Sequence, residues 1–95
     1  MNLYLISQNK VADYNTYDSA VVAAESNLDA RTIHPSKFVT HISNGQWMGT
    51  NSNNKEYESN DCTWVSYEDI DCINVEYLGK TNKKRGVILA SFNAG

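Results

Sequence analysis

The sequence predicts an α+β fold in which a small, mainly antiparallel sheet of about four to six strands carries one short helix. Three observations support this class. Apolar, strand-like runs lie near both ends of the chain, an Asn-Gly pair separates two further runs, and a helix-cap pattern precedes the only proline. With 95 residues, the chain is long enough for one domain, residues 1–95, with a modest core.

The first two predicted strands cover residues 2–7 and residues 19–25. Residues 2–7 alternate between two faces that are both apolar, which predicts a short internal strand. Residues 19–25 are rich in alanine and valine, and the alanines would also suit a helix. We expect a strand here because the following residues have the pattern of a helix start, which needs a non-helical segment before it.

The predicted helix covers residues 27–34. Ser26 is its N-cap, and Asp29, three residues later, completes a variant of the capping box. Pro35 disfavours helical geometry at the residue before it, so we expect the helix to end at His34.

A β-hairpin is predicted over residues 38–50, with Asn44-Gly45 at its tip. Asn-Gly accepts the positive φ angles of a type I′ turn, whose twist matches the flanking strands. The resulting register pairs Ile42 with Trp47, and His41 with Met48. Residues 51–60 are polar, and we expect them to form a surface loop.

The C-terminal part predicts a helical turn at residues 66–69, followed by two strands. Residues 72–78 alternate as a half-exposed strand does. Residues 87–93 are almost entirely apolar, which is typical of a strand buried on both faces. We therefore expect the last strand to lie inside the sheet, antiparallel to residues 72–78.

Charge and composition argue against several classes of partner. The net charge is −3, and basic residues cluster in one turn, at Lys80, Lys83, Lys84 and Arg85. This balance argues against duplex nucleic acid and against a membrane surface, because both need an extended positive surface. The chain shows no signal peptide and no apolar run of bilayer length, so a cytoplasmic location is expected. Cys62 and Cys72 are then expected to be reduced thiols, with no metal site and no cofactor.

Candidate binding residues lie first at the start of the second strand and at the end of the last one. Tyr14, Tyr17 and Asp18 form either a packed turn or an aromatic shelf that stacks a planar ligand such as a nucleobase. Ser91 and Asn93 either point into a shallow pocket or satisfy the end of the chain.

Three further candidates lie on the predicted helix and hairpin. Arg31 and His34 share one turn of the helix, where they either hold an anion or form an exposed face near a helix C-terminus that favours positive charge. Trp47 is either an exposed apolar tip that contacts a protein or a part of the core.

Two segments resemble small uncharacterised proteins encoded by phages and bacteria: residues 14–25, which read Tyr-Asn-Thr-Tyr-Asp-Ser-Ala-Val-Val-Ala-Ala-Glu, and residues 87–95. Residues 30–35 and 64–65 are similar to the same group, whereas residues 38–60 look like an insertion. The resemblance implies a compact, phage-associated protein in the host cytoplasm. By analogy with other small phage proteins, it implies an inhibitor or sequestering protein directed against host defence. No activity is established for the group, so the resemblance assigns no functional residue.

The preferred function is a non-enzymatic binding protein, because no catalytic constellation is visible and the chain contains six tyrosines, which suit binding surfaces. Its partner would be a protein that it occludes or a small ligand, such as a nucleotide, that it sequesters. Two alternatives stay open. One is a self-associating accessory protein, since so small a domain is expected to form a homo-oligomer. The other is a small hydrolase that uses Asp18, His34 or the acidic residues between 61 and 76.

Overall fold

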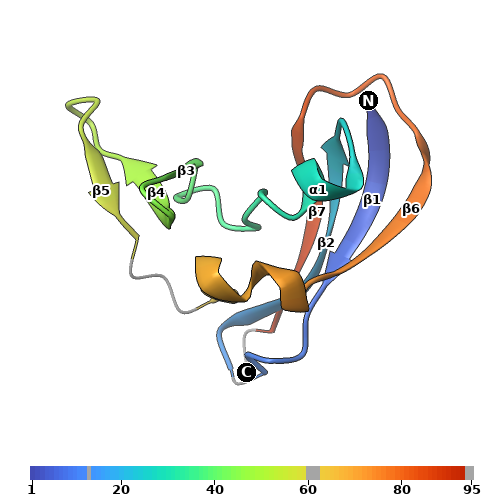
Figure 1. The fold of residues 1–95 in the computed structure, drawn as a ribbon, viewed down its shortest axis with the longest axis horizontal. Coiled ribbons are helices and arrows are strands. Elements are labelled where there is room, and N and C mark those ends of the chain that lie inside the picture. The colour runs from blue at the N-terminus through green and yellow to red at the C-terminus, as the bar shows by residue number, and fades with distance from the viewer. Residues whose placement is uncertain (13, 60–62, 94–95) are drawn as a thin grey trace.

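The computed structural model describes residues 1–12, 14–59 and 63–93 and contains two antiparallel sheets (Figure 1). The larger sheet has four strands in the order β6-β1-β2-β7, and the smaller sheet has three in the order β3-β4-β5. A short α-helix and a 3₁₀-helix complete the fold, so the predicted α+β class with a mainly antiparallel sheet is confirmed. The thiol predicted at Cys62 lies outside the described residues, whereas Cys72 is an exposed free cysteine.

The centre of the larger sheet is the antiparallel pair β1 (Asn2–Ser7) and β2 (Thr16–Ala24). Both strands were predicted, and β1 is internal as expected, because β2 and β6 pair with its two sides. Alternate residues of the pair face the core. Tyr4, Ile6 and Val22 are buried there, which matches the period of two in a strand.

The helix α1 (Asn27–Ala30) begins where the capping pattern predicted, because the Ser26 hydroxyl accepts a hydrogen bond from the Asp29 amide (3.1 Å). Its end differs from the predicted range 27–34. The amide of Thr32 bonds to the carbonyl of Asp29 (3.0 Å), three residues back, so the chain tightens after α1 and leaves the helix. Pro35 therefore comes too late to set the end of the helix.

The hairpin of β3 (His41–Ser43) and β4 (Gln46–Thr50) is confirmed, with both predicted residue pairs in register. Asn44 and Gly45 occupy the turn with φ angles of 55° and 71°. These are the left-handed conformations that a type I′ turn requires.

The expected surface loop at 51–60 contains a third strand, β5 (Glu56–Glu58), which pairs with β4. Its polar composition concealed the strand, because both glutamates and Tyr57 lie on the surface. The Tyr57 ring lies so close to Gly49 that a Cβ atom there would come within 2.5 Å of it. Glycine at this position therefore leaves room for the Tyr57 ring against β4.

The largest correction concerns the last two strands, β6 (Asn74–Lys80) and β7 (Gly86–Asn93). The last strand was expected to lie inside the sheet and to pair with the strand before it. Instead β6 pairs with β1, β7 pairs with β2, and the two form opposite edges. The connection crosses the end of the sheet and is flanked by Gly79 and Gly86, whose φ angles of 141° and 145° few other residues adopt.

The position of β7 also overturns its predicted burial, because Leu89 is 68% exposed. An apolar run indicates burial only where other elements cover both of its faces. Here β6, β1 and β2 occupy the other three places in the sheet, which leaves β7 at the edge with an exposed side.

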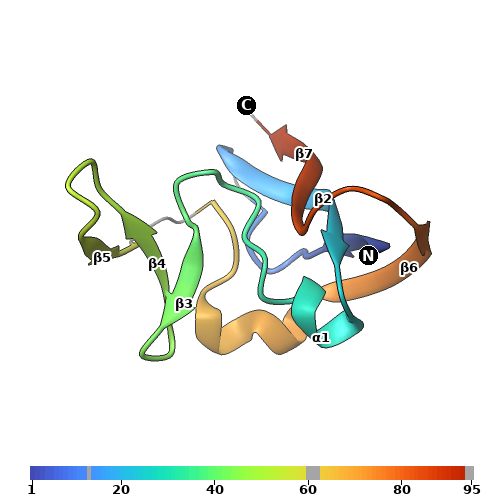
Figure 2. The same ribbon diagram turned by 90° about the horizontal axis from the view of Figure 1, so that it is seen from above.

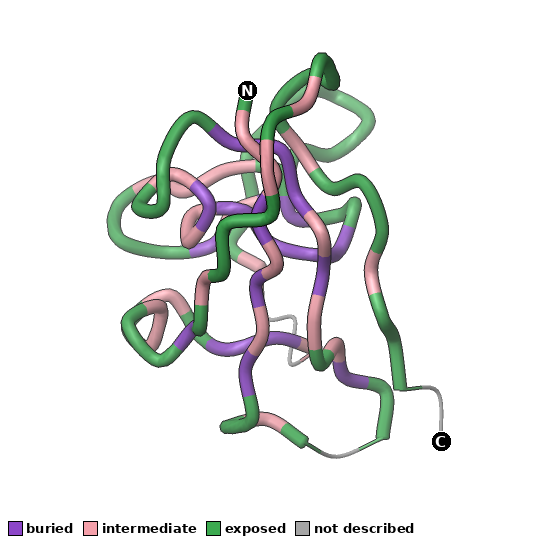
Figure 3. Tube along the Cα trace, turned by 90° about the vertical axis from the view of Figure 1, so that its right-hand side faces the viewer, coloured by how far each residue is buried: buried purple, intermediate pink, exposed green. Residues whose placement is uncertain are grey.

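The core lies on one side of the larger sheet. Figure 2 shows α1, the 3₁₀-helix η1 (Tyr67–Cys72) and the smaller sheet all on that side. The helical turn predicted at 66–69 corresponds to the start of η1. Figure 3 shows that β7, which leads to the C-terminus, is exposed over most of its length. On the side of the sheet away from the core, Leu5 and Val21 are half-buried.

Replacing Ile6 by Ala should lower the free energy of unfolding by about 2–5 kcal/mol, because the side chain is fully buried and its loss leaves a cavity. Leu89→Ala should change this free energy by about 0.5 kcal/mol or less, as expected for an exposed side chain. Urea denaturation of dilute protein measures both values. A loss at Leu89 as large as that at Ile6 would contradict the edge position of β7.

Replacing Gly45 by Val should cost about 1–3 kcal/mol, since a β-branched residue is strained at the positive φ of 71°. Gly45→Asn is the matched control, because asparagine tolerates this conformation and should cost much less. Thermal unfolding followed by tryptophan fluorescence compares the variants. Equal melting temperatures for the Val and Asn variants would show that the turn conformation is not required.

Candidate ligand-binding site

The structure divides the predicted binding residues between two regions of the molecule. One region is the end of the larger sheet where β2 begins and β7 ends, and it contains Tyr14, Tyr17, Asp18, Ser91 and Asn93. The other region lies between α1, η1 and the hairpin, and it contains Arg31, His34 and Trp47.

A hollow of about 410 Å³ lies in the first region. Its walls are the turn that follows β1, the start of β2 and the last residues of β7. Three of the predicted residues, Asp18, Ser91 and Asn93, line it together. They meet because β2 and β7 are antiparallel neighbours, so the beginning of one strand lies beside the end of the other.

Buried polar contacts hold the walls of the hollow in place. The Gln8 amide accepts a hydrogen bond from the Val11 amide (2.8 Å) and donates to the carbonyls of Val11 and Tyr17 (2.8 Å each). Asn15 has a φ of 63°, and its amide bonds to the carbonyl of Asn93. Because Gln8 is only 6% exposed and makes three bonds, it fixes the turn after β1 against β2.

The polar side chains of the hollow remain available to a ligand. Asp18, Ser91 and Asn93 are exposed, and among residues 1–12, 14–59 and 63–93 their side chains have no hydrogen-bond or ion-pair partner. No described residue in the lining is cationic. The hollow therefore offers a carboxylate, a hydroxyl and an amide without a compensating positive charge.

The aromatic residue in the lining of the hollow is Phe92, which was not predicted from the sequence. Phe92 is 44% exposed and lines the hollow, and its ring meets the ring of Tyr17 edge-on, with centroids 4.8 Å apart. Tyr14 is exposed beside this end of the sheet. The recognisable signal for Phe92 is its position between Ser91 and Asn93, which becomes informative once β7 is an edge strand.

An ion pair connects the turn of the hollow to η1. Lys10 Nζ lies 2.9 Å from the Asp69 carboxylate, which also accepts a hydrogen bond from the Ser66 hydroxyl (3.0 Å). The hydrogen bond from Lys10, followed by that from Ser66, lowers the pKa of Asp69. The same bond raises the pKa of Lys10.

Arg31, a candidate anion ligand, is directed at the backbone instead. Its Nη1 donates hydrogen bonds to the carbonyls of Ile70 (3.0 Å) and Ile73. The guanidinium thus connects the end of α1 to η1 and to the start of β6. The early end of α1 explains this direction, because Arg31 is the C-cap residue rather than part of a helix face.

His34 and Trp47 are both buried, so of the two alternatives for Trp47 the structure shows the core position. Their rings meet edge-on with centroids 5.1 Å apart, and Trp47 Nε1 donates to the carbonyl of Val65 (3.0 Å). The Ser36 amide donates to His34 Nδ1 (3.0 Å). The tip of the hairpin therefore presents Asn44-Gly45, and the tryptophan connects the smaller sheet to the core.

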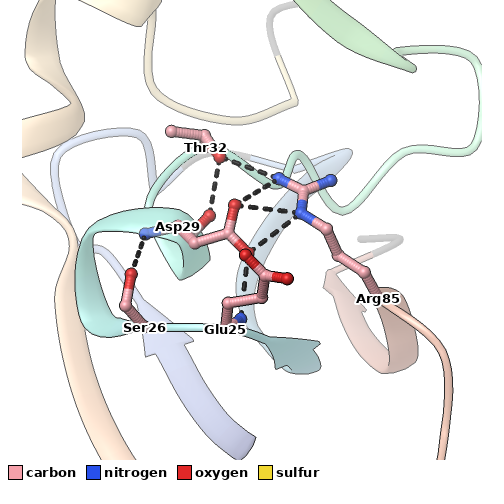
Figure 4. Close-up of polar contacts among 5 residues, drawn as sticks. All are labelled: Glu25, Ser26, Asp29, Thr32 and Arg85. Carbon is pink, nitrogen blue, oxygen red and sulfur yellow. Dashed lines mark hydrogen bonds and ion pairs between the residues drawn. The ribbon is translucent and has the colours of Figure 1, made fainter. Parts of the chain in front are cut away.

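A second groove, of about 190 Å³, lies beside His34 and Trp47 and is lined at its other end by Arg85. Arg85 is already engaged (Figure 4): its Nε donates to the Asp29 carboxylate (2.9 Å) and its Nη2 to the Thr32 hydroxyl (2.9 Å). The Asp29 carboxylate also accepts a bond from the Glu25 amide (3.0 Å). The Arg85 cation of this second groove is therefore already paired and is not free to bind a ligand. For this reason the first hollow is the better candidate site.

The described part of the chain has neither a metal-binding cluster nor a membrane-spanning helix. Residues 1–12, 14–59 and 63–93 contain no cluster of three or more histidine, cysteine or acidic side chains arranged to hold a metal ion. Among the same residues, no helix is both long enough and apolar enough to cross a bilayer. No protein-family model, curated protein or solved structure matches the chain significantly.

Replacing Lys10 by Met should raise the pKa of Asp69 toward its ordinary value, because the ion pair and hydrogen bond that lower it are lost. In the native protein the lowered pKa of Asp69 stabilises the folded state at pH values above the pKa of Asp69 in the unfolded chain. This stabilisation is lost as the pH falls through the pKa of Asp69 in the folded protein. Carboxyl NMR titration of Asp69 measures the shift. Lys55→Met, at an exposed position just before β5, is the control and should leave the titration unchanged.

Proposed function

We propose that this protein is a non-catalytic binding module that holds a small, uncharged polar molecule with a planar ring in the hollow between β2 and β7. A nucleoside has this chemistry. The observation that carries the proposal is the meeting of Asp18, Ser91 and Asn93 with Phe92 in one hollow, with the three polar side chains free of partners among the described residues.

The size and the walls of the hollow support this proposal. Its volume of about 410 Å³ is within the range of small-molecule pockets. Gln8 holds the turn after β1 through its buried amide, so part of the site is formed before a ligand arrives. A preformed site loses less conformational entropy on binding than a flexible one.

The charge of the hollow favours a nucleoside over a nucleotide. The Asp18 carboxylate is exposed in the lining, and none of the described lining residues is cationic. A phosphate group placed beside this carboxylate would be repelled, whereas ring nitrogens and ribose hydroxyls can hydrogen-bond to it. Phe92, an exposed aromatic residue of the lining, supplies the ring on which we propose that a base stacks.

Binding is favoured over hydrolysis because the two residues proposed for acid–base chemistry lie apart. Asp18 lines the hollow, whereas His34 is buried against Trp47 and lines the other groove. No histidine or cysteine is among the described residues of the hollow. The sequestration of a ligand from a phage host, which the sequence resemblance implies, stays a prediction.

Titration with adenosine, guanosine, cytidine and uridine, followed by amide chemical shifts, tests this function. We expect saturable binding of at least one nucleoside, with shifts at residues 16–18 and 91–93, and weaker binding of its monophosphate. Phe92→Leu should weaken binding about fivefold or more, since base stacking on an aromatic ring contributes about 1–3 kcal/mol.

Tyr77→Leu, on the opposite edge of the sheet, is the matched control and should leave affinity unchanged. Asp18→Asn should reduce the difference in affinity between the nucleoside and its monophosphate, because it removes the negative charge that repels the phosphate. The absence of saturable binding for all four nucleosides, or a monophosphate that binds more tightly than its nucleoside, would overturn the proposal.

A further inference from the structure

The two edges of the larger sheet differ in charge. On the edge strand β6, Glu76 and Lys80 are exposed charged residues, which discourage pairing with another strand. The other edge strand, β7, has eight residues and contains neither a charged residue nor a proline. The register shifts at Leu78 of β6 and at Ile88 of β7, and the β2–β7 pair has a second shift at Asp18 of β2. Each edge strand itself therefore contains one irregularity.

The unprotected edge is also apolar. Val87, Ile88, Leu89 and Phe92 are all between 39% and 68% exposed. A strand at a sheet edge presents unpaired N–H and C=O groups on its outer side. Together these features provide main-chain hydrogen bonds and apolar area for a further strand.

We propose that β7 pairs antiparallel with β7 of a second copy of this chain, so that two four-stranded sheets join into one sheet of eight strands. A two-fold axis brings the same strand of both copies together in opposite directions, which is the arrangement of an antiparallel pair. An axis that passes Leu89, near the midpoint of β7, places Leu89 of the two copies opposite each other on the same face of the joined sheet.

Charge complementarity favours a second copy as the partner. The turn before β7 carries Lys83 and Lys84, which are exposed, while the exposed Asp18 lies beside the end of β7. Antiparallel pairing places the start of each strand beside the end of the other. The two lysines of one protomer then lie at the same end of the joined sheet as Asp18 of its partner, and this long-range attraction occurs twice across the axis.

Arg85, which follows the two lysines, does not take part in this attraction, because its guanidinium is bound to Asp29 and Thr32 within the same protomer. These bonds also fix the start of β7 to α1, as Figure 4 shows. The edge is therefore held in position before a second copy binds, which reduces the entropy lost on association.

A row of apolar side chains on the side of the sheet away from the core leads toward the same two-fold axis. Leu5 pairs with Val21, and Val21 pairs with Leu89, so the three side chains lie side by side across β1, β2 and β7. Exposure increases along this row toward the edge, since Leu89 is the most exposed of the three. A second β7 places another Leu89 at the open end of the row.

Sedimentation velocity from micromolar to millimolar concentration tests this assembly in the absence of any small ligand. The wild-type protein should form a dimer at the upper end of this range. Leu89→Lys should raise the dimer dissociation constant at least tenfold, because two lysines then face each other near the axis. Leu78→Lys, on β6, is the matched control and should dimerise as the wild type does, with circular dichroism confirming that both variants fold.

Charge reversal provides a second test that leaves the strand itself unchanged. The double variant Lys83→Glu/Lys84→Glu should weaken the dimer, and adding Asp18→Lys should restore it. A wild-type protein that is monomeric at millimolar concentration would overturn the proposal. So would a dimer that resists Leu89→Lys, or one that is lost on Leu78→Lys, because either result places the contact elsewhere.

Discussion

The antiparallel pairing of β1 with β2 is the interaction on which the rest of the structure depends. Its register runs without interruption from Asn2 opposite Ala24 to Ser7 opposite Ser19, and it buries alternate side chains on the core side. The other strands of the larger sheet attach to this pair, and α1 follows β2 directly. Because both helical segments and the smaller sheet lie on the same side of the larger sheet, the β1–β2 pair forms the base on which the core packs.

The smaller sheet is attached to this base through aromatic side chains. Trp47 reaches the core from β4, where its ring contacts His34 and Tyr67 and its indole nitrogen bonds to the carbonyl of Val65. Edge-on ring contacts of this kind add to the burial of the rings themselves. One residue therefore connects the hairpin, the segment after α1 and the start of η1, which explains why the core includes residues of both sheets.

Local signals in the sequence were sufficient to predict those parts of the structure that depend on residues close together in the chain. Asn44-Gly45 and the Ser26–Asp29 cap each set a backbone conformation within a few positions, and both were predicted correctly. The place of β7 depends on which strands occupy the middle of the sheet, and its apolar composition does not contain that information. The direction of Arg31 depends on where α1 ends. Asp18, Ser91 and Asn93 were predicted individually, but only the β2–β7 pairing brings them together.

The crossing between β6 and β7 has a consequence for how the chain folds. Strands that are neighbours in sequence lie at opposite edges, so the sheet cannot grow by adding successive hairpins. Ser7 must meet Asn74, and Thr16 must meet Asn93, which are contacts of long sequence separation that slow folding. During synthesis, the β1–β2 hairpin exists with both of its sides open until residues 74–93 are made. The growing chain should therefore depend on chaperones mainly after β2 has been made and before residues 74–93 have been made.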